Sequence, residues 1–276
     1  MTGDPEVAGE AAPKKKKKRA CERCGNFARR ARLGGRRWCL ECLDRCDPIE
    51  RGPIDVGSLV AATLSLASRA APRLLVPALV YALLLAVIDL QLGVEASASL
   101  LGMLLGGLWG IVVLSLRVDL AMAVVEGRPL PETGALFAAA GRRFGALFGL
   151  QFVTGLVVGA WSLLLVIPGI VRGLDLTLAP AIFLLEDGHG VSLSMSESTA
   201  RMRGSRVTAM LAGAVLMGVP MVAIVAGLGL FPMTEVRVGA VLLLHLMLTF
   251  IPFVSMALYV KLRWAAAREK LAGPAR

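Results

Sequence analysis

Charged residues are scarce in this chain of 276 residues, and several long stretches almost lack them. Lys, Arg, Asp and Glu make up 18% of the sequence, against about 25% in an average soluble domain. Hydrophobic residues make up 56%. This balance excludes an ordinary soluble protein, because runs of about 18 apolar residues are long enough to cross the hydrocarbon core of a bilayer.

Groups that carry catalysis are also scarce. The chain has only two histidines, and it shows no nucleophile–base pair and no paired carboxylates. No glycine-rich phosphate loop ends in Gly-Lys-Ser/Thr. We therefore expect that the protein is not an enzyme.

Cysteine is absent after residue 46, and all five cysteines lie between residues 21 and 46. Four of them form the pairs Cys21-x2-Cys24 and Cys39-x2-Cys42. Two such pairs are typical of a tetrahedral structural zinc site with four thiolate ligands. Cys46 could replace Cys42 or remain a spare thiol, and four ligands already complete the ion. The sequence predicts bound Zn²⁺ in a small zinc-ribbon or treble-clef-like module.

Basic residues surround this cysteine module. Gly34-Gly35 is a good hairpin turn, and the flanking positions are Arg29, Arg30, Arg32, Arg36 and Arg37. Modules with such edges can bind nucleic acid. Anionic lipid headgroups beside the membrane explain the same charge, and we favour this second interpretation.

Composition divides the chain into five segments. We expect a disordered polybasic tail (1–20), the zinc-ribbon-like module (21–47), a linker (48–55), a transmembrane helical domain (56–264) and a cytosolic basic tail (265–276). No apolar run follows the lysines at 14–18, so no secretory signal peptide is expected. The module should therefore stay in the cytosol, where reduced cysteines favour a metal over disulfides.

Hydropathy predicts an all-α polytopic fold with about six transmembrane helices. The expected spans are Arg73–Leu92, Leu100–Leu116 continuing to Val125, Phe144–Ile167 ending at Pro168-Gly169, Leu174–Leu185 interrupted by Pro180, Val207–Leu230, and Arg237–Val260. Lys and Arg cluster in every second segment between these spans, on the same side as the N-terminus, and the other side carries only Arg172 and Arg237. The clustered residues after the lysines at 14–18 are Arg19, Arg117, Arg128, Arg142, Arg143, Arg201, Arg203, Arg206, Lys261, Arg263, Arg268 and Lys270. The positive-inside rule then places both termini in the cytoplasm of a cell whose inner (plasma) membrane holds the protein.

An amphipathic stretch precedes each outward-going span. The three stretches are Asp55–Ala71, Pro131–Arg143 and Val191–Arg206. Each could lie in the cytosolic interface as a separate helix, or it could be a helical extension of the span that follows. We favour the interfacial alternative, because one side of the first stretch is apolar at helical spacing.

Ionisable residues near the membrane are candidates for function. Arg172 and Asp175 are spaced i, i+3 on one helix face, and Asp89 ends the first span on the same predicted outer side. We expect these three residues to form an outer polar cluster. His245, in the sixth span, is either hydrogen-bonded to a neighbouring helix or part of a transport path.

A second charged pair lies at the predicted cytosolic end of the second span. Arg117 and Asp119 are expected to snorkel to the interface or to pair with Arg142 or Glu126.

Several motifs resemble a bacterial membrane domain that is fused to some glycerophosphodiester phosphodiesterases and also stands alone. They are Ile54–Leu59 followed by Pro72-Arg-Leu-Leu, Ile167-Pro-Gly-Ile170, Ala179-Pro-Ala181, Leu185-Glu-Asp-Gly188, and Ser198-x5-Gly204. In that family the chemistry resides in a separate barrel domain. The resemblance therefore implies a membrane fold without catalytic activity.

Two functions remain after these exclusions. The first is a non-catalytic inner-membrane scaffold or regulator whose cytosolic zinc module docks an unknown protein partner. The alternative is a small transporter or channel with the module as an accessory domain. In both, the lipid bilayer and its anionic headgroups are partners.

Overall fold

The computed structural model describes residues 30–33, 36–39, 54–92, 96–186, 188–230, 249–250 and 252–272. Its elements are β1 (Arg30–Leu33), β2 (Arg36–Cys39), α2 (Val56–Leu92), α3 (Ala96–Val125), α4 (Thr133–Leu164), α5 (Val166–Leu176), α6 (Ala179–Leu185), α7 (Val191–Met202), α8 (Arg206–Leu230) and α10 (Phe253–Ala272). The regular elements among these described residues are helices, apart from one two-stranded hairpin. The all-α prediction is confirmed for this part of the chain.

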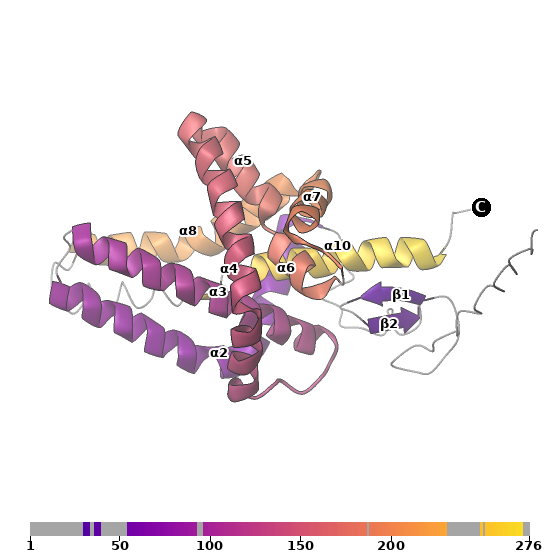
Figure 1. Ribbon diagram of the computed structural model, residues 1–276, viewed down its shortest axis with the longest axis horizontal. Coiled ribbons are helices and arrows are strands. Elements are labelled where there is room, and N and C mark those ends of the chain that lie inside the picture. The colour runs from indigo at the N-terminus through magenta and orange to yellow at the C-terminus, as the bar shows by residue number, and fades with distance from the viewer. Residues whose placement is uncertain are drawn as a thin grey trace, which may run out of the picture.

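The helices form two arms that cross (Figure 1). The first arm, called the helical arm, consists of α2, α3 and α8. In it α2 contacts both other helices, and all three extend toward one end of the molecule. α4 runs steeply across this arm, and α5 folds back against α4 to form the α4–α5 hairpin. α10 extends away from the helical arm, with β1 and β2 beside it.

Four described segments are long and apolar enough to cross a membrane: Val56–Leu83, Leu104–Val125, Thr133–Leu164 and Val166–Leu185. The protein is therefore a membrane protein. Because the hairpin crosses the helical arm steeply (Figure 1), the helices of both cannot all lie along one membrane normal. A count of six spans stays a prediction, and Arg237–Val260 lies mostly outside the described residues.

α2 joins the first amphipathic stretch to the first span in one continuous helix. Asp55 caps it by accepting the Ser58 backbone N–H at 2.8 Å. Buried residues recur every three or four positions along both parts, namely Leu59, Ala62, Leu66, Ala70, Leu74, Ala78 and Ala82. Because one buried stripe runs unbroken from Leu59 to Ala82, this stretch is an extension of the span and not a separate interfacial helix.

The other two amphipathic stretches behave differently from each other. The second is again continuous with its span, because α4 runs unbroken from Thr133 to Leu164. The third forms a separate helix, α7, which ends at Met202. A turn then leads to α8, and Gly204 in this turn has φ of +89°, a left-handed conformation that glycine adopts without strain.

The Ile-Pro-Gly motif begins a helix, whereas the sequence predicts that it ends one. α4 stops at Leu164, Leu165 is extended, and Pro168 lies in the first turn of α5, where its missing N–H leaves no bond unmade. Gly169 allows the hairpin to close. A Cβ on Gly169 would lie 2.0 Å from Ser162 Oγ and 2.8 Å from Ser162 Cα.

The fourth predicted span is two short helices. Thr177 and Leu178 separate α5 from α6, and Pro180 lies in the first turn of α6, where proline is tolerated. The predicted interruption near Pro180 is therefore present, but it comes before the proline and not at it.

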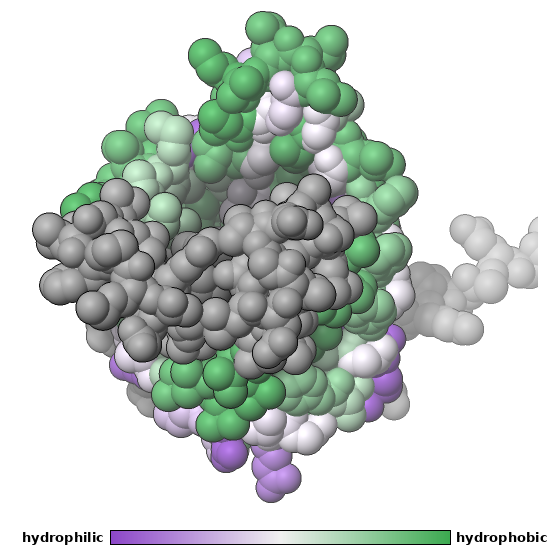
Figure 2. Space-filling model, turned by 90° about the vertical axis from the view of Figure 1, so that its left-hand side faces the viewer, coloured by the Kyte–Doolittle hydropathy of each residue, from purple (hydrophilic) through white to green (hydrophobic). Residues whose placement is uncertain are grey.

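The projecting end of the α4–α5 hairpin is covered by hydrophobic side chains (Figure 2). The five residues from Leu163 to Ile167 are between 66% and 90% exposed. Soluble monomers rarely expose a contiguous apolar patch of this kind. This end is therefore built to contact an apolar medium.

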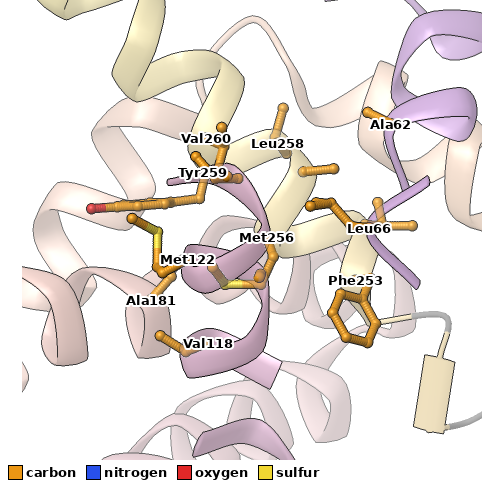
Figure 3. Packing of buried hydrophobic residues seen from close by; sticks show 14 of the residues in the cluster. Ala62, Leu66, Val118, Met122, Ala181, Phe253, Met256, Leu258, Tyr259 and Val260 are labelled. Atoms are coloured by element: carbon orange, nitrogen blue, oxygen red, sulfur yellow. The ribbon is translucent and has the colours of Figure 1, made fainter. Parts of the chain in front are cut away.

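The main hydrophobic core lies where the helical arm, α6 and α10 meet. Figure 3 shows Leu66 of α2, Val118 and Met122 of α3, Ala181 of α6, and Phe253 and Met256 of α10 converging there. α10 is buried over nearly its whole first half, from Phe253 to Val260. It is therefore a central element of the fold, and its helix continues to Ala272, into the segment predicted to be a tail.

Candidate functional site

The hairpin of the cysteine module is present as predicted. β1 and β2 pair antiparallel on either side of residues 34–35, with Arg30 opposite Cys39 and Ala31 opposite Trp38. The β1 strand packs against α10. The β1–β2 hairpin therefore lies against α10, the last described helix.

Cys39 is the only predicted zinc ligand among the described residues, and it is 2% exposed. It belongs to the same hydrophobic core as residues of α2, α3 and α10. Cys21, Cys24, Cys42 and Cys46 lie outside the described residues. The four-thiolate set suits Zn²⁺ by its donor chemistry, and zinc stays a prediction.

Asp175 is the centre of one ionic cluster, the Asp175 cluster. Its Oδ1 accepts from Arg206 Nε at 2.5 Å, and Arg172 Nη1 lies 3.9 Å from Oδ2. Ser198 Oγ donates to the Asp175 backbone oxygen at 2.5 Å and accepts the Leu178 N–H at 3.2 Å. These contacts tie the break between α5 and α6 to α7 and α8.

Two members of the predicted outer polar cluster, Arg172 and Asp175, do lie together, but Asp175 has a further partner that the prediction did not include. Arg206, which the charge pattern assigns to the inner side, is the nearer partner of Asp175, so the two lie at one level of the molecule. The Asp89 side chain lies outside the described part. The end of α2 that carries Asp89 is far from α5 (Figure 1), because α2 extends along the other arm. Besides its contact with Asp175, Arg172 lies over the Trp161 ring, with its guanidinium carbon 5.3 Å from the ring centroid.

Glu186 is the centre of a second and denser cluster, the Glu186 cluster. Arg201 donates to both of its carboxylate oxygens, at 2.5 and 3.0 Å. Tyr259 Oη donates to Oε1 at 3.1 Å, and Arg263 Nε lies 3.2 Å from the same oxygen. His189 Nε2 lies 3.8 Å from Oε2. The carboxylate therefore joins α6, α7 and α10 at one point.

Opposing effects set the ionisation of Glu186. Burial disfavours the charge, but the hydrogen bond from Arg201 and the charges of Arg263 and Arg201 outweigh burial, so the pKa of Glu186 lies below its ordinary value. The group is a carboxylate at neutral pH. Since cationic and hydroxyl donors already surround both oxygens, the cluster is suited to holding helices together and not to binding a substrate.

Sequence reasoning missed the Glu186 cluster and, at Asp175, the partners Arg206 and Ser198. Glu186 appears in the sequence analysis only as part of a family motif, and His189, whose side chain is 19% exposed and lies beside Glu186, does not appear there as a candidate. The sequence signal that could have indicated the Glu186 cluster is an acidic residue directly after an apolar run, together with arginines in later segments that can pair with it. His245 lies outside the described residues.

The charged pair of the second span is also arranged differently from the prediction. Asp119 accepts from Arg143 Nη1 through both oxygens at 2.9 Å, and Glu126 pairs with Arg128. Arg117 is left without a carboxylate among the described ion pairs.

No family model matches this chain, and neither do any curated proteins or solved structures. The resemblance to the phosphodiesterase-associated membrane domain therefore stays a prediction.

Proposed function

We propose that this protein is a non-catalytic membrane scaffold or regulator whose cysteine module binds zinc and docks a protein partner. The observation that carries the proposal is the placement of Cys39. This predicted ligand is buried in the core that α10 shares with the helical arm.

Because of this placement, metal binding at Cys39 would affect the helices of the membrane domain. A zinc ion held through Cys39 would fix the β1–β2 hairpin, and β1 packs against α10. α10 carries Tyr259 and Arg263 to the Glu186 cluster. A partner bound to the module would therefore act on a helix that contacts most of the fold.

Localisation follows the same proposal. Arg201 and Arg263 come from two segments that the positive-inside rule assigns to the cytoplasm, and they meet on one carboxylate. This meeting supports a common side for these two segments. We propose an inner (plasma) membrane location with both termini in the cytoplasm.

Co-purification of the full-length chain in mild detergent, with zinc measured in each sample, tests the proposal. Cys21→Ser/Cys24→Ser removes two predicted ligands without touching the buried Cys39, and it should lose both zinc and partner. Cys46→Ser is the matched control and should keep both. Zinc-free wild type, or a partner that stays bound after zinc is lost, would contradict the adaptor role.

The alternative of a small transporter or channel makes a different prediction for the same variants. Solute flux through the membrane domain should persist in Cys21→Ser/Cys24→Ser, because the module is then only an accessory. Flux that persists while no zinc-dependent partner appears would favour the transporter.

A further inference from the structure

A cleft between α3 and α4 lies apart from both ionic clusters. It has a volume of about 600 Å³, and α3 lines it between Leu104 and Ile111. Phe148, Gln151 and Phe152 of α4 form the facing wall. The volume falls in the range of pockets that hold small molecules.

The wall of this cleft is apolar, and its rim faces outward. Leu104, Leu108, Phe148 and Phe152 are between 42% and 59% exposed. Both helices belong to segments apolar enough to cross a membrane. The cleft is therefore open on an apolar face of the protein, where acyl chains can enter.

Two glycines create the space on the α3 side. A Cβ placed on Gly107 or on Gly110 would meet nothing within 4 Å. Gly106, one position away, behaves differently, because its Cβ would lie 3.3 Å from Tyr81 Oη. Gly107 and Gly110 therefore border empty volume, whereas Gly106 serves the contact between α2 and α3.

Arg117 brings a positive charge to this apolar cleft. The residue is 7% exposed, and its side chain folds back along α3 so that Nε donates to the Val113 oxygen at 3.2 Å. Nη1 is buried and has no hydrogen-bond partner among the described residues. A buried cation without a counter-ion is costly in an apolar environment. The nearest acid along α3, Asp119, is held by Arg143.

Gln151 offers a second donor on the opposite wall. Thr154 Oγ1 donates to Gln151 Oε1 at 3.1 Å. The same hydroxyl also lies 3.0 Å from the Gln151 backbone oxygen, and the amide nitrogen of Gln151 has no acceptor among the described residues, so it can donate to a ligand. An anion that reaches Arg117 can therefore be held from α4 as well.

We propose that the α3–α4 cleft binds one anionic amphiphile. Its acyl chain lies against the apolar wall, and its phosphate or carboxylate accepts hydrogen bonds from Arg117 and Gln151. A phospholipid and a free fatty acid share this chemistry. The proposal goes beyond the scaffold function and does not rest on the zinc module.

Native mass spectrometry of the delipidated full-length protein in nonionic detergent tests this site. We would titrate dioleoyl phosphatidylglycerol, oleate and inorganic phosphate separately. The wild type should retain one amphiphile per chain, and inorganic phosphate alone should not bind measurably. Retention of phosphatidylglycerol identifies a phospholipid site, and retention of oleate alone identifies a fatty-acid site.

Three variants locate the binding. Arg117→Gln should weaken retention by about tenfold or more, because it removes the charge that the headgroup meets. Gly110→Leu fills the cleft and leaves Arg117 in place, so it should weaken retention of either amphiphile even if Arg117→Gln fails to fold. Arg142→Gln removes an exposed arginine of α4 and should bind as the wild type does.

Several outcomes would overturn the proposal. Wild-type retention by Gly110→Leu would show that the cleft is not the site. Unchanged retention by a folded Arg117→Gln would remove the role of the charge. Inorganic phosphate bound as tightly as the amphiphiles would show that no acyl chain is recognised.

Discussion

α3 and α4 are both long and apolar enough to cross a membrane, yet the fold uses them in opposite ways. In the most apolar window of α3, 61% of the residues are buried inside the protein, against 17% in the corresponding window of α4. α3 lies in the core with α2, α6 and α10, whereas the end of α4 that projects from the molecule lies beside α5 (Figure 1).

The two helices differ in burial because they have different packing partners, and not because they differ in hydrophobicity. A membrane helix gains little from leaving lipid for protein, because acyl chains are as apolar as leucine side chains. Close packing and polar ties therefore decide which apolar helix is enclosed. The ionic clusters around Glu186 and Asp175 join the helices at the packed region, whereas no described ion pair lies within the apolar end from Leu163 to Ile167.

The largest loss of stability is expected from a change in the Glu186 cluster. Glu186→Gln leaves Arg201 and Arg263 without their carboxylate, and breaking a buried pair in this way costs about 3–5 kcal/mol. Unfolding of the full chain by SDS in mixed micelles measures this loss. Glu197→Gln is the matched control: its side chain is 39% exposed and also pairs with Arg201, so it should cost less than about 1 kcal/mol. Equal losses would show that the Glu186 cluster does not hold the packed region together.

Lowering the pH should also remove the stability that Glu186 contributes, because it protonates the carboxylate. Because the pKa of Glu186 is lower in the folded protein than the ordinary value of 4.5, its contribution is complete above about pH 4.5. That contribution is lost as the pH falls through the folded value. Stability curves between pH 7 and pH 3 should therefore fall more steeply for the wild type than for Glu186→Gln. Parallel curves would contradict this assignment.

A smaller difference is expected between leucines of the two helices. Leu120 on α3 is fully buried, and Leu164 at the end of α4 is 73% exposed. Leu120→Ala should cost about 2 kcal/mol or more through the cavity it leaves, whereas Leu164→Ala should stay within about 0.5 kcal/mol. The same SDS titration measures both. A large loss at Leu164 would mean that the hairpin end is packed against protein.

The smallest loss of stability is expected at Gly169, which lies close to Ser162 in the α4–α5 hairpin. Gly169→Ala places a Cβ against Ser162 and should cost about 1–3 kcal/mol through overpacking. Gly173→Ala is the control, because its Cβ would lie 3.9 Å from Val158 Cγ1, an ordinary contact. It should be neutral or slightly stabilising, since alanine favours helix. Thermal denaturation in detergent compares the two, and equal melting temperatures would show that the hairpin is not closed at Gly169.

The positions of the helices and of the hairpin were largely predictable from the sequence, and the contacts between distant segments were not. Val207–Leu230 matches α8 within one residue, and Gly34-Gly35 correctly indicates a hairpin. The Ile-Pro-Gly motif was assigned to a helix end, because a proline in a first turn and a proline after a last turn look alike in sequence. The ties of Asp175 to Arg206 and of Glu186 to Arg263 span 31 and 77 residues (206 − 175 and 263 − 186), and no local pattern predicts contacts over such separations.

The sequence by itself determined that this is a helical membrane protein with a cysteine module at its N-terminal end, because hydropathy and cysteine spacing are properties of consecutive residues. Only the tertiary structure decided which apolar helix is enclosed and which is exposed. It also decided that the β1–β2 hairpin packs against α10, and that Arg117 lies beside an apolar cleft with no carboxylate partner among the described residues. The physical reason is that burial and ion pairing depend on which segments meet in space, and segments of equal hydropathy can meet in many ways.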